Sequence, residues 1–239
     1  MRVYKLAGVN VGIEAAEYTY EKCRAYECDG ATPDFTVAVT AEQVKREQEI
    51  SQNTSYEYCE FVCIYRAICT ILPLYNRLLL HAAVIEKDGA AYAFAAKSGT
   101  GKTTHINLWK KLYGDSVRMI NGDKPILRFD GDTVYACGTP WCGKEGYNSN
   151  REAPLRAICF LERAQSNSIV ELSENEAVSL IMKQILIPKV GESAVKTLEL
   201  CSTLLENVKI YKLYCNMDTD AARVACEKMS AAPSDRRCL

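Results

Sequence analysis

The stretch AFAAKSGTGKTTHINLW, residues 93–109, decides the fold that we predict for this chain. Its beginning is apolar, its centre is rich in glycine, and its end has the apolar spacing of a helix. Residues 96–103 fit the pattern [AG]-x-x-x-x-G-K-[ST], in which backbone N–H groups surround phosphates at the N-terminus of a helix. The sequence therefore predicts a strand, a phosphate-binding loop and a helix in direct succession.

The position that usually carries the first glycine of this loop is occupied by Ala96. The interior glycines Gly99 and Gly101 stand where the backbone must approach a phosphate closely or adopt a positive φ. The first position mainly begins the bend, so a methyl group is expected to fit there. We therefore predict that the loop is intact.

The residue types in the loop indicate how it would hold a nucleotide. Lys102 is predicted to reach the β- and γ-phosphates, and the hydroxyl of Thr103 is predicted to ligate Mg²⁺. The expected cofactors are therefore Mg²⁺ and ATP, or another nucleoside triphosphate. The residues predicted to contact the nucleotide are Ser98, Gly99, Thr100, Gly101, Lys102, Thr103 and Thr104.

The flanking sequence predicts an antiparallel partner for the strand that enters the loop. The apolar runs within residues 78–96 are separated by the turn signal Lys87-Asp88-Gly89, which is typical of a hairpin. His81 lies in the first run and is one of 2 histidines in the chain. Spacing alone leaves two roles open for His81, an active-site residue or a histidine satisfied within the core.

A second acidic residue is needed beside the phosphates to hold or position a metal. Residues 116–120 read as a strand that delivers Asp123 at its end, 21 positions past Lys102. We therefore predict Thr103 and Asp123 as metal ligands, and Asp123, His81 and Lys102 as catalytic residues. The alternative is that Asp123 only forms a turn before Pro125.

The glycine-rich segment CGTPWCGKEGYNSNR, residues 137–151, joins two predicted strands, where substrate loops commonly lie. Lys144 or Arg151 could complement the transferred phosphate, and Trp141 could pack on a base or a substrate. Trp141, Lys144, Glu145 and Arg151 are therefore candidate substrate residues. An ordinary long connection is the alternative for this segment.

The rest of the chain completes an α+β organisation in one compact unit. Residues 1–75 are predicted to form a small lead-in packed on the core, and residues 76–239 a nucleotide-binding catalytic domain with a C-terminal helical region. The pattern predicts strands at 2–13, 33–40, 116–120, 155–161 and 209–215, and two-stranded hairpins over 78–96 and over 125–138, the latter turning at Asp130-Gly131. It predicts helices at 15–26, 41–50, 57–72, 105–113, 174–186, 193–208 and 218–229. Thr40 and Gln43 have the spacing of a capping box before the helix at 41–50.

Composition narrows the class of protein. With a formal net charge of −1, the 239-residue chain gives no electrostatic reason to bind nucleic acid or an anionic membrane. Its 12 cysteines include no Cys-x-x-Cys, and no signal-peptide pattern precedes them, so reduced thiols and a cytoplasmic location are expected. No apolar run reaches the roughly 18 residues of a membrane span. The sequence does not fix the oligomeric state, and a homo-oligomer is one of the states that it allows.

The hairpin with His81, the loop AAKSGTGKTT and the segment INGDKP together resemble the catalytic domain of HPr kinase/phosphorylase, over about residues 76–165. That domain belongs with the phosphoenolpyruvate carboxykinase-like phosphate-loop fold. The chain is also similar to short bacterial HPr-kinase-like proteins, some of which phosphorylate peptides, including lasso-peptide precursors. The shared stretches are DFTVAVT, LHAAVI, SGTGKTTH, GDKPILR, GTPWCGK and PLRAICFLER. The resemblance implies a mixed, largely antiparallel sheet.

The resemblance also implies roles for individual residues. His81 matches the active-site histidine of the family, and Lys102 and Thr103 match its loop lysine and metal-binding hydroxyl. The family has paired aspartates after the second strand, one a metal ligand and one a base, where this chain has Gly122-Asp123. One carboxylate is missing. Either another residue such as Glu145 supplies it, or the loose transition state needs positioning more than a strong base.

The sequence thus favours a Mg²⁺-dependent kinase that transfers the γ-phosphoryl group to a hydroxyl. The acceptor would be a serine of a peptide or protein, or a small molecule. One alternative is a nucleotide-binding regulatory or partner protein with reduced activity, which the single aspartate supports. Another is nucleotide hydrolysis or phosphorolysis at the same site.

Overall fold

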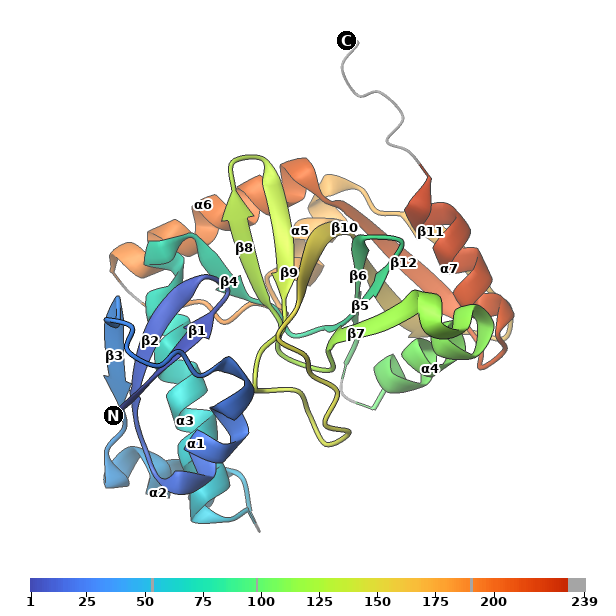
Figure 1. The fold of residues 1–239 in the computed structure, drawn as a ribbon. Coiled ribbons are helices and arrows are strands. Elements are labelled where there is room, and N and C mark those ends of the chain that lie inside the picture. Colours follow the sequence, from blue (N-terminus) through green and yellow to red (C-terminus); the bar gives the residue numbers. More distant parts are fainter. Residues whose placement is uncertain (53, 98, 190, 232–239) are drawn as a thin grey trace.

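The chain folds around two β-sheets, a smaller one near the N-terminus and a larger central one (Figure 1). The structure is a computed structural model that describes residues 1–52, 54–97, 99–189 and 191–231. Helices and strands are mixed along the whole chain. This arrangement confirms the predicted mixed α/β fold class.

The smaller sheet contains β1 (Arg2–Leu6), β2 (Val9–Glu14) and β3 (Phe35–Ala38), in that order. β1 and β2 form an antiparallel hairpin, and β3 pairs parallel with β2. The prediction of one strand over residues 2–13 was wrong, because the chain turns at Ala7 and Gly8, with φ of 48° and 84°. An alanine seldom adopts a positive φ, so its sequence gives little signal of such a turn.

Three helices accompany this sheet, α1 (Glu17–Cys23), α2 (Ala41–Ile50) and α3 (Tyr56–Ile71). The predicted capping box is confirmed, since the Gln43 amide donates to the Thr40 hydroxyl (3.2 Å) and the Thr40 amide donates to the Gln43 side chain (2.7 Å). The segment Tyr56–Tyr75 is long and apolar enough to cross a membrane by length and composition, and 39% of its apolar window is buried in the protein. A single helix of this kind is also typical of a soluble core, so it is weak support for a span.

The larger sheet has 9 strands, with the order β4-β8-β9-β10-β6-β5-β7; β12 pairs with β10, and β11 with β12. The strands are β4 (Arg77–Leu79), β5 (Ala83–Lys87), β6 (Ala90–Ala95), β7 (Val117–Asn121), β8 (Ile126–Asp130), β9 (Thr133–Cys137), β10 (Glu152–Arg163), β11 (Ser168–Glu171) and β12 (Lys209–Cys215). β10 pairs in parallel with β6 and β12, and the other pairs are antiparallel. The predicted mixed, largely antiparallel sheet is thus confirmed.

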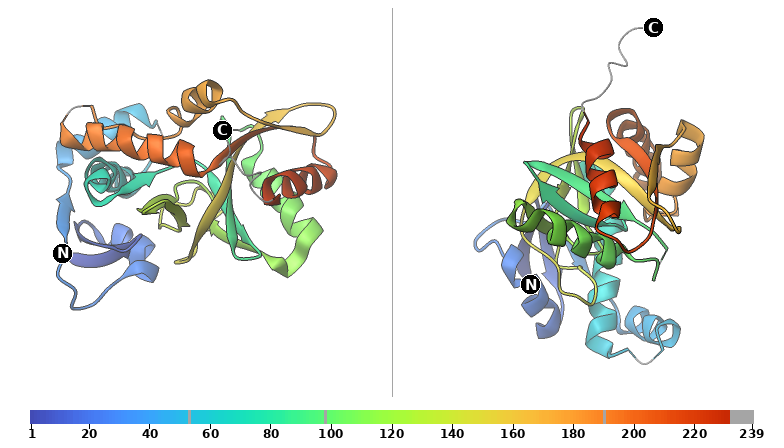
Figure 2. Two further views of the ribbon diagram at one scale, coloured as in Figure 1. Left: turned by 90° about the horizontal axis from the view of Figure 1, so that it is seen from above. Right: turned by 90° about the vertical axis from the view of Figure 1, so that its right-hand side faces the viewer.

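Helices cover both faces of the larger sheet (Figure 2). Side chains of β6 alternate between the faces, as a strand requires: Phe94 packs with α4 and α7, while Ala93 packs with α5 and α6. The helices are α4 (Lys102–Tyr113), α5 (Glu174–Ile181), α6 (Glu192–Asn207) and α7 (Asp220–Ser230), and short 3-10 turns occur at Arg24–Tyr26, Leu72–Tyr75 and Gly114–Ser116.

The N-terminal elements share a core with the larger sheet. Ile126 of β8, Cys137 of β9 and Trp141 of the following loop pack among the buried side chains of β1, β2 and α3. The division at residue 75 remains a prediction. The cysteines that the structure describes are free thiols.

Candidate functional site

The predicted phosphate loop joins β6 to α4. Gly99 and Gly101 have φ of 76° and 122°, so both positions need glycine for their backbone conformation, as expected. Ala96 is 5% exposed and packs in the core with Ile106, so its methyl group is accommodated. Ser98, predicted to contact the nucleotide, lies outside the described residues.

The start of α4 presents groups suited to an anion. Lys102 and Thr103 are the first two residues of the 12-residue helix, where free backbone N–H groups and the helix dipole favour negative charge. The Thr103 hydroxyl donates to Glu145 Oε1 over 3.3 Å. Thr100 precedes Gly101 in the loop, and Thr104 is the third residue of the helix, so both lie next to Lys102 and Thr103 in the sequence.

Arg163, at the end of β10, fixes the loop from the neighbouring strand. Its guanidinium donates to the carbonyl oxygens of Gly99 (2.6 Å) and Thr100 (3.2 Å). The sequence analysis missed this residue, because it is separated from Gly99 by 64 positions and follows an ordinary buried strand. The conformation of the loop therefore depends on a contact that no local motif encodes.

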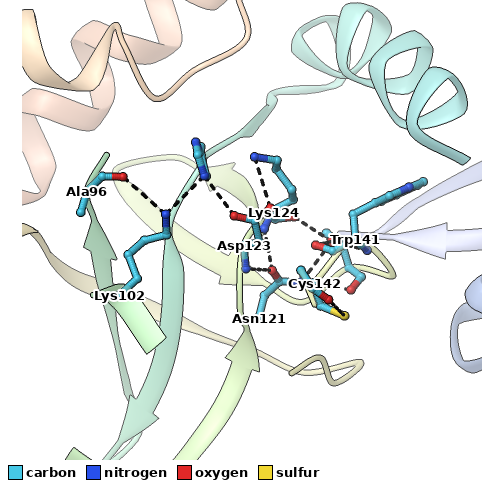
Figure 3. Close-up of polar contacts among 10 residues, drawn as sticks. Ala96, Lys102, Asn121, Asp123, Lys124, Trp141 and Cys142 are labelled. Carbon is cyan, nitrogen blue, oxygen red and sulfur yellow. Dashed lines mark hydrogen bonds and ion pairs between the residues drawn. The ribbon is translucent and has the colours of Figure 1, made fainter. Parts of the chain in front are cut away.

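Lys102, His81 and Asp123 form a continuous chain of polar contacts (Figure 3). His81 Nε2 lies 3.0 Å from Asp123 Oδ1 and 3.4 Å from Lys102 Nζ. The side chains of His81 and Asp123 are 34% and 29% exposed, so both are accessible to a ligand. The structure thus brings the three predicted catalytic residues together.

A single ring nitrogen of His81, Nε2, lies close to both neighbours and can form a hydrogen bond with only one of them at a time. When Nε2 carries a proton, it donates to the Asp123 carboxylate, which is the shorter contact. Lys102 then keeps only long contacts, of 3.4 Å each, to that ring and to the carbonyl oxygen of Ala96. Its ammonium therefore has hydrogen-bonding capacity left for an anionic ligand.

The turn that presents Asp123 is held by a fully buried amide. Asn121 Oδ1 accepts from the backbone N–H of Asp123 (2.8 Å) and of Lys124 (2.7 Å), while its Nδ2 donates to the carbonyl of Thr139 (3.0 Å). Because this amide is satisfied on both sides, it fixes the position of Asp123 against the start of the following loop.

The electrostatic surroundings keep Asp123 ionised. Burial alone would raise the pKa of its carboxyl, but the hydrogen bond from His81 and the charges of Lys124 and Lys102 outweigh that effect, and the pKa lies below its usual value. Lys124 Nζ lies 3.4 Å from Asp123 Oδ2. Burial and the charge of Lys102 lower the pKa of Lys124, although Asp123 raises it. Asp123 is thus suited to accept a cation.

The structure explains why a second carboxylate is absent beside Asp123. A Cβ atom on Gly122 would lie 2.6 Å from the carbonyl oxygen of Cys142 and 3.2 Å from Cβ of Tyr147. The Gly122 amide also donates to the carbonyl of Tyr147 over 2.7 Å. The loop at 138–151 therefore occupies the space that any side chain at position 122 would need.

The tip of the same loop brings Glu145 to the site. A Cβ atom on Gly143 would lie 3.4 Å from Cβ of Asp123 and 3.6 Å from Glu145 Oε2, so the two acidic residues flank Gly143. Glu145 also accepts from Thr103. Tyr147 supports the loop, because Lys110 of α4 lies 4.3 Å above its ring.

The remaining candidates lie elsewhere. Trp141 is 5% exposed, stacks on Phe61 (ring centroids 5.3 Å apart) and donates to the Phe61 carbonyl (3.0 Å), which corrects the expectation that it packs on a base or substrate. Lys144 is exposed at the loop tip. Arg151, at the base of the loop, lines a pocket that contains none of the phosphate-loop residues. His105 is buried, and this burial lowers its pKa to about 3.

The residues around Thr103 fit Mg²⁺ in their chemistry. Thr103, Asp123 and Glu145 offer only oxygen donors, which Mg²⁺ prefers. In the described part of the chain, no group of three or more His, Cys, Asp and Glu residues is placed to hold a metal alone. This fits Mg²⁺, because in nucleotide sites one or two carboxylates hold it together with the phosphates.

Comparison with known proteins places the chain in a family. One similar solved structure is the HPr(Ser) kinase/phosphatase from Coxiella burnetii, with a TM-score of 0.36 and 8% identity, covering 64% of this chain and 99% of that chain. The likeness is remote. No curated protein matches the sequence. Residues 49–213, more than half of the chain, match the family described as SynChlorMet cassette protein ScmC. The chain therefore belongs to the ScmC family of SynChlorMet cassette proteins.

Proposed function

We propose that this protein is a Mg²⁺-dependent kinase that binds ATP, or another nucleoside triphosphate, at residues 96–104. It transfers the γ-phosphoryl group to a hydroxyl of a peptide, a protein or a small molecule. The observation that carries this proposal is the chain of contacts from Lys102 through His81 to Asp123, located beside the start of α4. A helix start with free backbone N–H groups and an ionised carboxylate are thus in one place, which supports phosphate and metal binding there.

Different groups of the chain bind the phosphates and the metal. The loop N–H groups and the Lys102 ammonium hold the phosphates, and Arg163 keeps the loop in shape. Thr103 and Asp123 would hold the metal. When bound, Mg²⁺ neutralises charge on the phosphates and orients them. His81 donates to Asp123 and thereby fixes the carboxylate.

We assign Glu145 as the general base that takes up the proton of the acceptor hydroxyl. A bond forms between the acceptor oxygen and the γ-phosphorus while the bridging oxygen leaves with the nucleoside diphosphate, and the hydroxyl proton passes to the Glu145 carboxylate. Asp123 is less suited to this step, because its lowered pKa makes it a weak base. Glu145 is exposed and lies beside Thr103, at the open side of the site.

Binding of a nucleotide without transfer is the second candidate function. The filled space at Gly122 supports it, since the position beside Asp123 cannot carry a carboxylate without displacing the carbonyl of Cys142. A protein of this kind would act as a regulatory or partner protein. Hydrolysis of the nucleotide, with water as the acceptor, would use the same groups.

Calorimetry with a panel of nucleoside triphosphates, with and without Mg²⁺, tests the binding step. Lys102→Ala should weaken binding about tenfold or more, because it removes charge-assisted contacts to phosphate. Lys111→Ala, an exposed lysine on the same helix, is the matched control and should bind as the wild type does. If no Mg²⁺–nucleotide binds the wild type, the proposal fails.

Transfer is then tested with nucleotide labelled at the γ-phosphate. The acceptor panel should contain serine peptides, proteins and small hydroxyl compounds, with water as the reference acceptor. A labelled acceptor supports the kinase. Binding without any labelled acceptor and without released phosphate would support the regulatory protein, and released phosphate alone would support hydrolysis.

A further inference from the structure

A pocket of about 470 Å³, the one that Arg151 lines, lies between the β1–β2 turn and the strands β8, β9 and β10. It contains none of the residues of the proposed nucleotide site that the structure describes. Its charged side chains are four cations and one carboxylate, namely Lys5, Arg77, Arg128, Arg151 and Glu152. The lining is therefore strongly cationic although the protein as a whole has a net charge of −1.

Two of the cations face each other directly. Arg77 of β4 and Arg128 of β8 are paired residues in the antiparallel register. Like charges in directly opposite positions destabilise a sheet unless another group compensates them. Arg128 is compensated, because it forms ion pairs with Glu152 (2.6 Å) and Asp130 (3.4 Å) and lies 4.0 Å above the ring of Tyr135.

Arg77 has no such compensation. It donates to the backbone carbonyls of Ala7 (2.8 Å), Tyr75 (2.8 Å) and Asn76 (3.3 Å), and within the described residues it forms no ion pair with a carboxylate. Burial and the charge of Arg128 lower the pKa of Arg77. Its Nη2 makes none of these hydrogen bonds, and a Cβ atom on Gly8 would lie 3.3 Å from it.

We propose that this pocket binds an oxyanion, a carboxylate or phosphate group, on the guanidinium groups of Arg77 and Arg128. Lys5 and Arg151 are exposed and complete the positive rim. The free Nη2 arm of Arg77 can donate a charge-assisted hydrogen bond to an oxygen of the anion, while Nε and Nη1 stay on the backbone carbonyls. The bound group supplies the negative charge that Arg77 lacks, since Arg128 is already paired with Glu152 and Asp130.

The pocket also borders the loop that carries Glu145. The two ends of that loop, Gly138 and Arg151, both line the pocket and are joined by a 2.8 Å backbone hydrogen bond. An anion at this place therefore contacts the base of the loop whose tip touches Thr103. The oxyanion can be part of an acidic polypeptide segment or a free small ion, and the two sources have the same chemistry at the pocket.

Amide chemical shifts of the full chain separate this pocket from the phosphate loop. Inorganic phosphate, a tetraglutamate peptide and a tetraglutamine peptide are titrated into the wild type and into Lys102→Ala, which weakens anion binding at the loop. The amides of Gly8, Gly138 and Arg151 report on the pocket, and those of Gly99 and Gly101 report on the loop. Because no nucleotide or transfer is needed, failure of the kinase proposal would leave this test valid.

We expect phosphate, tetraglutamate or both to shift the amides of Gly8 and Arg151 in both proteins, and tetraglutamine to shift neither. The double variant Lys5→Gln/Arg151→Gln should weaken this binding about fivefold, since exposed charges contribute modestly. The control Lys45→Gln/Lys183→Gln removes two exposed lysines elsewhere and should bind as the wild type does. The anion that binds more tightly identifies the source.

Two results would overturn the proposal. In one, neither phosphate nor tetraglutamate moves the pocket amides at any concentration at which the protein stays folded, whether or not the loop amides respond. In the other, the double variant and its control bind the anions equally well. Arg77→Met is a further variant, whose unfolding is followed by circular dichroism. The difference in unfolding free energy between the wild type and Arg77→Met should be larger with saturating phosphate than without added anion. The reason is that bound anion stabilises only the intact pocket.

Discussion

Asp123 Oδ1 and His81 Nε2 lie 3.0 Å apart and join the end of β7 to the segment between β4 and β5. The backbone reinforces this junction, because the Ala82 amide donates to the Asp123 carbonyl over 3.1 Å. The backbone bond and the side-chain contact thus join the same two segments at adjacent residues. This pair sets the charge of the carboxylate that the proposed function needs.

His81→Ala should raise the pKa of Asp123 toward its ordinary value, because the variant removes the hydrogen bond that lowers it. In the wild type the lowered pKa stabilises the fold above the unfolded-state pKa, and that stability is lost as the pH falls through the folded-state pKa. In the variant the folded-state pKa lies closer to the unfolded-state pKa, so the stability lost on acidification should be smaller and its loss should be complete at a higher pH. Carboxyl NMR titration and denaturant unfolding at several pH values measure both effects. Asp132→Asn, at an exposed hairpin turn, should leave both unchanged.

Asp123→Asn and Glu145→Gln should separate metal binding from proton transfer. Asp123→Asn is expected to remove the gain in nucleotide affinity that Mg²⁺ provides and to leave the metal-free affinity nearly unchanged. Glu145→Gln is expected to retain Mg²⁺–nucleotide affinity and to slow transfer about 100-fold, the usual size of a general-base effect. Calorimetry and single-turnover rates measure the two. The opposite pattern would exchange the assigned roles.

Arg163→Gln should weaken nucleotide binding about tenfold with little change in unfolding free energy, because Arg163 is exposed and acts on the loop alone. Arg163→Lys should restore only part of the affinity, since an ammonium cannot reproduce two parallel guanidinium contacts. Arg156→Gln is the matched control, as Arg156 donates to the carbonyls of Ser230 and Ala231 instead. Equal nucleotide affinity in Arg163→Gln and the wild type would show that the loop holds its shape unaided.

Gly122→Ala should lower the free energy of unfolding by about 1–3 kcal/mol, because its methyl group would overlap the carbonyl oxygen of Cys142. Gly122→Asp, which would place two aspartates side by side, should therefore destabilise the loop and should not raise transfer activity. Urea denaturation and the transfer assay measure these effects. Ala96→Gly serves as a comparison, and it should leave nucleotide affinity within about twofold, since the loop already adopts its conformation with alanine.

Local patterns predicted most of the secondary structure. The helix α2 begins at the predicted cap, Thr40, and the hairpin of β5 and β6 turns at the predicted Asp88-Gly89, because these signals act over a few residues. The short strand β11 carried no comparable signal, since its pairing with β12 is a tertiary contact. The turn at Ala7 was missed because it is stabilised by the distant Arg77, which donates to the Ala7 carbonyl.

The sequence predicted the residues at the centre of the candidate site but not the contacts of the residues around them. Lys102 and Asp123 follow from the loop pattern and from the end of the next strand, and the structure brings both to His81. The role of Arg163 and the burial of Trp141 depend on long-range packing, which a motif does not encode. Glycine at position 122 could be read as a lost carboxylate, but its steric cause needed the fold.

The stacking of Trp141 on Phe61 has a consequence for dissection of the chain. The indole belongs to the loop of the proposed catalytic half, whereas its stacking partner belongs to α3 in the lead-in. Excision of residues 1–75 would leave Trp141, Ile126 and Cys137 with bare apolar surface, which favours aggregation of the fragment. The lead-in thus covers the apolar base of the same loop that reaches Asp123 and Thr103.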